Sequence, residues 1–113
     1  MPKYLISFPA AAMQVPEAEL EAMGQAARAV VAQAKAAGVF VFAGGIDTRT
    51  PPVRVAADGR VHPGGYPDGP QLDGGFAVFE LPSPEAAQAW AARLATACRC
   101  AQELRVFFVD PDV

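Results

Sequence analysis

The residues that could perform chemistry gather in the middle of the chain, around the only histidine, His62. A general base working near neutral pH would be this imidazole, or a carboxylate or thiol with a shifted pKa. Asp68 follows within the same loop region, close enough in sequence to orient the ring. His62 and Asp68 are therefore the candidate catalytic pair, with simple solvent exposure of the histidine as the alternative.

Three further residues form the candidate ligand site. Arg54 lies inside an apolar segment, where a guanidinium requires a carboxylate partner or an anionic ligand. If the pairing is structural, Asp68 or Asp73 is the expected partner; otherwise Arg54 would hold a small carboxylate-bearing molecule. Tyr66 is interpreted either as a mobile aromatic over that ligand or as an ordinary loop anchor.

The sequence contains no recognisable set of metal ligands and no cofactor motif. Cys98-Arg99-Cys100 lacks the spacing of zinc ligands and of a redox CxxC pair. The Gly-Gly pairs are not followed by Lys and Ser or Thr, as a phosphate-binding loop requires. We therefore expect neither a metal nor a cofactor.

Hydrophobic periodicity predicts the elements that must position these residues. Strands are expected over residues 3–8, 39–43, 76–81 and 103–109, and the run 39–43 is typical of a strand buried on both faces. A first helix is predicted from Pro16 to Gly38. A second is expected to begin with Ser83 as its cap and Pro84 in its first position, and to bury Trp90.

The candidate site residues fall on a hairpin and on the loop that follows it. Residues 52–57 and 60–62 are the two strands of this hairpin, joined by a tight turn at Asp58-Gly59. Residues 63–75 form a loop rich in glycine and proline, in which Asp68-Gly69-Pro70 predicts a turn with positive φ at Gly69. The order β-α-β-β-α-β with an extra hairpin arm indicates a ferredoxin-like α+β fold. We expect the site in the cleft between the sheet and the 44–75 loops.

The composition describes one ordered domain over residues 1–113. Hydrophobic residues make up 52% of the chain, and the net charge of −3 includes no basic block, which argues against a nucleic-acid partner. No apolar run approaches the roughly 20 residues that span a bilayer. Residues 4–8 favour a strand over an export signal, and the closely spaced Cys98 and Cys100 are typical of free thiols, so we expect a cytoplasmic protein.

The predicted sheet carries apolar side chains on both faces, although two helices can cover only one of them. In the last strand Leu104 and Val106 point to one face, while Phe107 and Val109 point to the other. A bare apolar face of this size exceeds what a soluble monomer usually exposes. We therefore expect a homodimer through the open sheet face, the alternative being that the 63–75 loop folds over it.

Several local strings, in this order along the chain, resemble the YCII-related family, specifically its DGPF branch. They are Ala37-Gly38-Val39, Gly44-Gly45, Val53-Arg54-Val55, Asp58-Gly59, Asp68-Gly69-Pro70, Gly74-Gly75-Phe76, Glu85-Ala86 and Ala89-Trp90-Ala91. The resemblance implies a bacterial protein with a ferredoxin-like fold that dimerises as an α/β barrel. Some members are proposed to use a His–Asp pair for acid–base work.

This chain departs from that pattern in three ways. Gln71 stands where the branch usually has Phe, and only Gln71-Leu72-Asp73 replaces the acidic, lysine-containing segment that normally precedes Gly-Gly-Phe. The first helix contains no histidine, so the family's proposed dyad cannot be carried over. Two functions remain open. One is a non-catalytic dimeric module that binds a small metabolite or a protein partner. The alternative is a small acid–base enzyme, of lyase or isomerase type, acting on an anionic small molecule.

Overall fold

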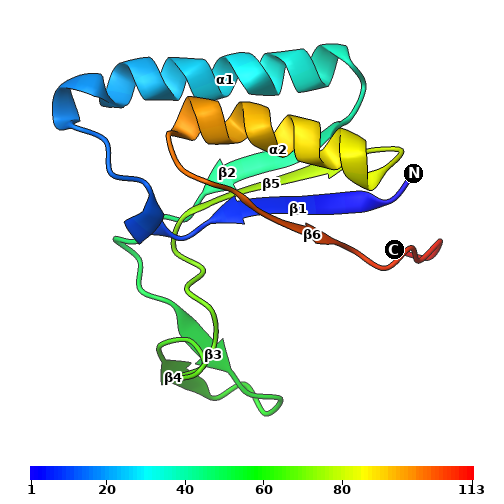
Figure 1. The fold of residues 1–113 in the computed structure, drawn as a ribbon. Helices are drawn as coiled ribbons and strands as arrows, with labels where there is room; N and C mark the ends of the chain where they lie inside the picture. The colour runs from blue at the N-terminus through cyan, green and yellow to red at the C-terminus, as the bar shows by residue number, and fades with distance from the viewer.

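The computed structural model describes residues 1–113 and shows an α+β fold with two helices and antiparallel strands (Figure 1). Two short 3-10 turns, at Ala10–Ala12 and Glu17–Glu19, lie between the first strand and the first helix. In chain order the strands and helices are β1 (Lys3–Phe8), α1 (Leu20–Ala36), β2 (Phe40–Gly45), β3 (Val53–Val55), β4 (Val61–Pro63), β5 (Gly75–Glu80), α2 (Pro84–Cys98) and β6 (Glu103–Val106).

Four of the strands form one antiparallel sheet in the order β2-β5-β1-β6. Strand β1 is paired on both sides, from Lys3 opposite Glu80 to Phe8 opposite Gly75 along β5, and with β6 along its other edge. Both helices cover the same face of this sheet (Figure 1). The sheet with α1 and α2, called the body below, therefore has one covered face and one face without any element of its own chain.

The hydrophobic core lies between the helices and the covered face. Phe79, Ile6 and Leu81 are its largest fully buried side chains. The ring of Phe79 meets Trp90 of α2 nearly edge-on, with 5.5 Å between ring centroids, and lies 6.0 Å from the Phe40 ring. Such tilted aromatic contacts add to the stabilisation from burial alone. Trp90 is half-buried and packs against this core, in line with its predicted role.

Of the three helix ends predicted from the sequence, two are confirmed and one is wrong. Ser83 Oγ accepts a hydrogen bond from the Ala86 N–H at 3.1 Å, with Pro84 in the first turn, which confirms the predicted cap of α2. Gly38 follows α1 with a φ of +74°, the conformation that ends many helices. The predicted start of α1 at Pro16 is wrong, because Glu17–Glu19 form a 3-10 turn and the α-helix begins at Leu20.

Two strand predictions need correction. β2 is not buried on both faces: it is an edge strand, and Phe42 remains 58% exposed because a register shift after Phe40 directs it to the bare face. The last strand ends at Val106 rather than Val109. Phe107 N–H still donates to Lys3 O at 3.0 Å, but β1 begins there and offers no further partner, so Phe108 is fully exposed.

The bare face, called the open face below, is apolar at its centre. Leu5 and Phe42 each lie opposite Val78, and directly opposed residues share a face of the sheet. At the edges of the face are two ion pairs, Lys3 with Glu80 at 3.3 Å and Arg105 with Glu103 at 3.2 Å. The 63–75 loop does not cover this face as a whole. Residues 70–72 reach only one end of it, where they line a hollow of about 210 Å³ together with Leu5 and Arg105.

The predicted hairpin is present, but as a separate two-stranded sheet formed by β3 and β4. Gly59 at the tight turn has a φ of +88°, and its N–H donates to Ala56 O at 2.9 Å, as predicted for Asp58-Gly59. Residues 52–65, called the arm below, project away from the sheet on the side opposite the helices (Figure 1). The radius of gyration, 15.6 Å, exceeds the roughly 13 Å expected of a compact chain of this length.

Candidate functional site

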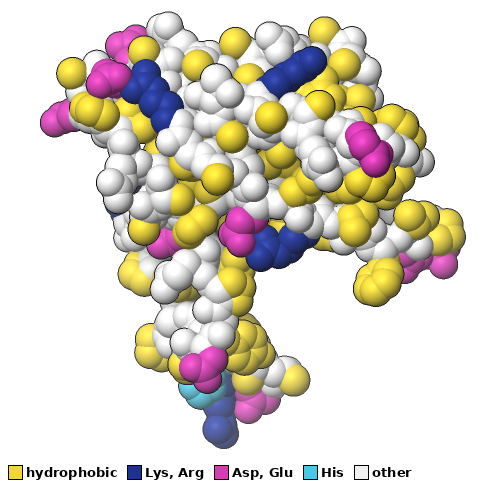
Figure 2. All heavy atoms as spheres, viewed as in Figure 1, with side chains coloured by type: hydrophobic (Ala, Val, Ile, Leu, Met, Phe, Trp, Pro, Cys, Tyr) yellow, Lys and Arg dark blue, Asp and Glu magenta, His cyan; other side chains and the backbone are white.

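Arg54 and His62 lie directly opposite each other on the arm, as Cα partners of β3 and β4. Their side chains therefore share one face of the two-stranded sheet. Arg54 makes neither of the predicted ion pairs. Its Nη1 donates instead to the carbonyl oxygen of Gly65 at 3.1 Å, within the arm itself. His62 is exposed, and in Figure 2 it is the single cyan side chain, on the arm.

The other sequence-predicted residues are not brought together with this pair. Asp68 and Tyr66 form part of an exposed turn in which Gly69 N–H donates to Tyr66 O at 3.0 Å. The positive φ predicted for Gly69 is wrong, because Gly69 is the fourth residue of this turn and the two central positions are those of Pro67 and Asp68. Asp73 has a structural role, since its Oδ1 accepts a hydrogen bond from the Ala10 N–H at 3.0 Å.

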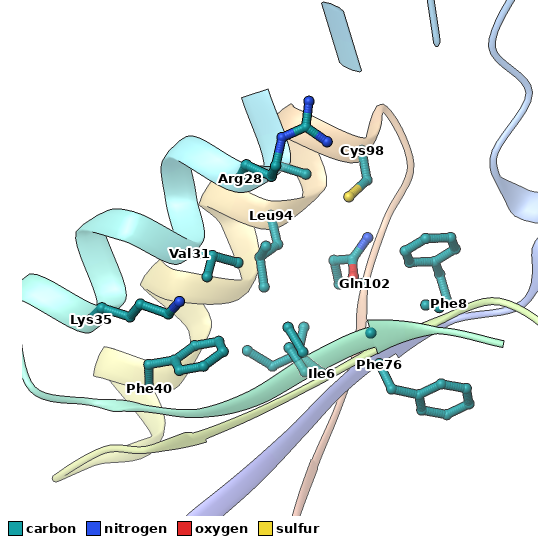
Figure 3. Close-up of a pocket in the computed structure, with 16 residues that line it drawn as sticks. Ile6, Phe8, Arg28, Val31, Lys35, Phe40, Phe76, Leu94, Cys98 and Gln102 are labelled. Atoms are coloured by element: carbon teal, nitrogen blue, oxygen red, sulfur yellow. The ribbon is translucent and has the colours of Figure 1, made fainter. Parts of the chain in front are cut away.

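A cavity of about 540 Å³ lies in the body, between the helices and the sheet. Figure 3 shows α1 and α2 above it and the sheet residues Ile6, Phe40 and Phe76 below. Gly45 and Gly75 form a cross-strand pair at this corner of the sheet. An added Cβ at Gly45 would have no atom nearer than 3.9 Å, so this glycine leaves open space under the helices, whereas at Gly75 the Phe8 ring occupies the place of a side chain. This volume falls within the usual range for small-molecule sites.

Two cations of α1, Arg28 and Lys35, belong to the lining of this cavity. They are seven residues apart in sequence, which places them on the same side of the helix two turns apart. Lys35 Nζ lies over the Phe40 ring, 5.2 Å from its centroid. Neither cation belongs to any of the five ion pairs of the chain. The exposed Arg28 and Lys35 thus give the mouth of a mostly apolar cavity, whose lining also includes Gln102, a positive charge that no carboxylate of this chain pairs with.

The lining also contains the buried thiol of Cys98. Burial raises the pKa of the Cys98 thiol, and the neighbouring Cys100 raises it further. The pKa of Cys100 is also raised by burial, while a hydrogen bond with Gln102 acts in the opposite direction. Both thiols are therefore protonated at neutral pH, which makes them poor nucleophiles and poor metal ligands. The cavity is better suited to binding than to covalent chemistry.

Sequence reasoning missed this cavity because no single residue in it belongs to a catalytic type. A signal was nevertheless present. The first Gly-Gly pair ends β2 and the second leads into β5, the strand that pairs with it, so glycine at both positions predicts a hollow where strands and helix meet. Two basic residues seven apart on the adjacent helix then indicate the sign of charge at its entrance.

Comparison with models of known protein families shows to which family this chain belongs. The family model of the YCII-related domain matches residues 3–107, from the first residue of β1 to just beyond β6. The chain belongs to the YCII-related family. A search of curated proteins found no match. The matched region includes all eight strands and helices, so the YCII-related domain comprises the body and the arm together.

Neither helix of this YCII-related protein combines the length and apolar character needed to cross a membrane. Its two candidate regions differ in what they offer chemically. The arm presents an exposed imidazole opposite a half-buried guanidinium that is bonded to the Gly65 carbonyl. The cavity presents an apolar volume with two unpaired cations at its entrance. The second arrangement is the one that encloses space for a ligand.

Proposed function

We propose that this YCII-related protein, as a divergent member of the DGPF branch, is a homodimeric binding module for a small apolar metabolite with an anionic group. The fold proposed is ferredoxin-like, of the dimeric α/β-barrel type. The sheet order β2-β5-β1-β6, with the helices of both crossovers on one face, supports this assignment. The two sheets of the dimer would pack through their open faces.

The accessible surface of the chain supports the dimer. A monomer of 11.8 kDa exposes 7866 Å², whereas a compact protein of that mass exposes about 5,900 Å². The excess of roughly 2,000 Å² per chain is well above the roughly 800 Å² that each partner buries in a standard interface. An apolar centre edged by ion pairs, as on the open face, is also the usual anatomy of an interface.

The cavity under α1 supports the choice of ligand. Its apolar walls would take up a hydrocarbon or aromatic body, because removing such surface from water is favourable by about 25 cal/mol per Å². Arg28 and Lys35 would hold a carboxylate or phosphate at the entrance, where no group of the chain competes for them. The unneutralised charge at an apolar cavity is the single observation that carries the ligand class.

The dimer is tested by sedimentation equilibrium of the wild type and of Val78→Asp, which introduces a charge at the centre of the open face. We expect a wild-type dimer and a folded monomer for the variant. Ala32→Asp, on the exposed side of α1, is the matched control and should remain dimeric. A wild type that sediments as a monomer at all concentrations would refute the dimer.

Ligand binding is tested by calorimetry with octanoate, phenylacetate and the matching neutral amides as probes. We expect the acids to bind more tightly than the amides and to lose at least tenfold in affinity in Arg28→Gln/Lys35→Gln. Gly45→Val should block binding by filling the cavity. The valine can be accommodated, since an added Cβ at this position meets no atom closer than 3.9 Å. Arg60→Gln, at the exposed tip of the arm, is the control. Equal affinity for acids and amides would refute the anionic ligand class.

A second function, acid–base catalysis of lyase or isomerase type on an anionic small molecule, rests on the juxtaposition of Arg54 and His62. In such an enzyme Arg54 would hold the anion and His62 would move the proton, with Asp68, Tyr66 and Asp73 as the further site residues predicted by sequence. Incubating the protein with a panel of 2-oxo acids in D₂O tests this directly. Exchange at the carbon next to the carbonyl should depend on His62 and vanish in His62→Asn. The absence of exchange with the wild type would remove this candidate for that substrate class.

A further inference from the structure

The two faces of the arm have opposite character. Arg54 and His62 lie on one face, and the residues on either side of them along each strand lie on the other. That second face consists of Val53 opposite Pro63 and Val55 opposite Val61. The three valines are each more than half exposed, Val55 by 66%. The arm therefore has a continuous apolar face that nothing in its own chain covers.

Backbone hydrogen bonds within the arm are not sufficient to stabilise it as a hairpin. Ala56 N–H donates to Arg60 O at 2.8 Å, and Gly64 N–H donates to Pro52 O at 2.9 Å. Beyond each other, β3 and β4 have no extensive packing partner in the chain. An isolated two-stranded hairpin is at best marginally stable in water, and its strands here have only three residues each. A surface outside the chain is needed to hold the arm in place.

The direction of the arm indicates which surface that is. It projects on the side of the sheet opposite the helices (Figure 1), which is the side on which a second copy packs in the proposed dimer. Figure 2 shows hydrophobic side chains along the arm, in yellow, beyond the edge of the body. One partner on that side covers the open face and the arm together, and twofold symmetry gives both arms the same environment.

We propose that the arm is a clasp: it reaches alongside the second copy and packs the face formed by Val53, Val55, Val61 and Pro63 against it. This inference rests on the proposed homodimer and specifies a second contact region within it. The exposed ion pair of Asp58 with Arg60 at the tip, 3.2 Å apart, remains in solvent. Part of the roughly 2,000 Å² of excess surface per chain is assigned to the arm. The clasp makes the arm an element of assembly.

The first test compares the two faces of the arm by sedimentation equilibrium. Val55→Asp/Val61→Asp places charges on the apolar face, and His62→Asp places one on the opposite face as the matched control. We expect the dissociation constant of the dimer to rise at least tenfold for the double variant and to stay within twofold for the control. If both variants dimerise as tightly as the wild type, the clasp is refuted while the dimer itself stands. If the wild type is a monomer, the proposed dimer fails first.

A second measurement, on the unaltered protein, excludes local unfolding of the arm as the cause of dissociation. A dimer is prepared from a mixture of ¹³C-labelled and unlabelled chains, and isotope-filtered NOEs are recorded from the methyl groups of Val55 and Val61. Intermolecular NOEs from these methyls are expected, with a pure labelled sample as the negative control. A dimer whose arm valines give only intramolecular NOEs overturns the proposal.

Discussion

The body and the arm are both built from short strands rich in β-branched and aromatic residues, yet they differ in what stabilises them. In the body, Phe79 is fully buried between two helices and two neighbouring strands. In the arm, Val55 has the same strand propensity but is 66% exposed, with a single neighbouring strand. Strand propensity therefore does not determine burial. The apolar side chains of the body are covered by their own chain, whereas those of the arm would be covered only by the proposed second copy.

The sharpest way to test this difference is to truncate one apolar side chain in each region, buried in the body and exposed in the arm. Phe79→Ala leaves a cavity against Phe40 and Trp90 and should lower the free energy of unfolding by about 3–5 kcal/mol, measured by urea denaturation. Val55→Ala, made in the monomeric Val78→Asp background, should change it by less than about 0.5 kcal/mol. A loss of more than 2 kcal/mol for Val55→Ala would show that the arm packs within its own chain.

The next largest difference in stability is expected between alanine substitutions at two glycines, one in the body and one in the arm. A Cβ added at Gly74 would lie 1.9 Å from Phe8 O and 2.9 Å from Ala10 N, which are backbone atoms and cannot swing aside. Gly74→Ala should therefore destabilise the protein by about 1–3 kcal/mol. At Gly65, in the arm, an added Cβ meets no atom within 4 Å. Gly65→Ala should be neutral or slightly stabilising in thermal unfolding; equal losses at both positions would contradict the contrast.

Side-chain hydrogen bonds to the backbone should also contribute more to stability in the body than in the arm, with smaller effects than the substitutions above. Ser83→Ala removes the acceptor of the Ala86 N–H at the start of α2 and should cost about 1 kcal/mol, while Ser83→Asp should retain most of the stability. In the arm, Asp58 Oδ1 accepts from the Arg60 N–H at 2.9 Å in full exposure to solvent. Asp58→Ala should change the unfolding free energy by no more than about 0.5 kcal/mol. A larger loss would show that the arm turn contributes to the stability of the folded body.

The smallest effect expected is a pH dependence that belongs to the body. Burial raises the pKa of Cys98 in the folded chain above its value of about 9 in the unfolded chain. The folded state therefore keeps this proton longer, so the linked stability is present below pH 9 and declines as the pH rises further. Urea denaturation between pH 7.5 and 10 should show a steeper decline for the reduced wild type than for Cys98→Ala. Parallel curves would mean that the thiol is not buried in solution.

The sequence predicted the elements well where local chemistry decides them. Ser83 followed by Pro84 set the start of α2, and Asp58-Gly59 set the turn of the arm, because both signals act within a few residues. It failed where the outcome depends on which strands become neighbours. The apolar run of β2 was assigned to a strand buried on both faces, but its place at the edge of the sheet leaves Phe42 exposed. Similarly, β6 ends where β1 begins, which no property of Phe107 or Val109 could reveal.

The candidate site was less predictable than the fold. His62 and Arg54 were selected by residue type, and the structure pairs them across the arm, but Asp73 is bonded to the Ala10 N–H near the sheet. The cavity, in contrast, depends on residues from both helices and three strands of the body, including two glycines selected by their lack of a side chain. A site formed by missing atoms leaves only a weak signal in a sequence, because glycine also has ordinary uses in turns and at strand ends.

The cross-strand pair of Gly45 and Gly75 also bears on how this protein can change over generations. At Gly75 an added Cβ would lie 2.6 Å from the Phe8 ring, so a larger residue requires that ring to shift. At Gly45 the nearest atom is 3.9 Å away, and replacement by alanine or valine requires a change of one base in the codon. The size of the cavity can therefore change through a single codon while the buried core around Phe79 is inherited unchanged.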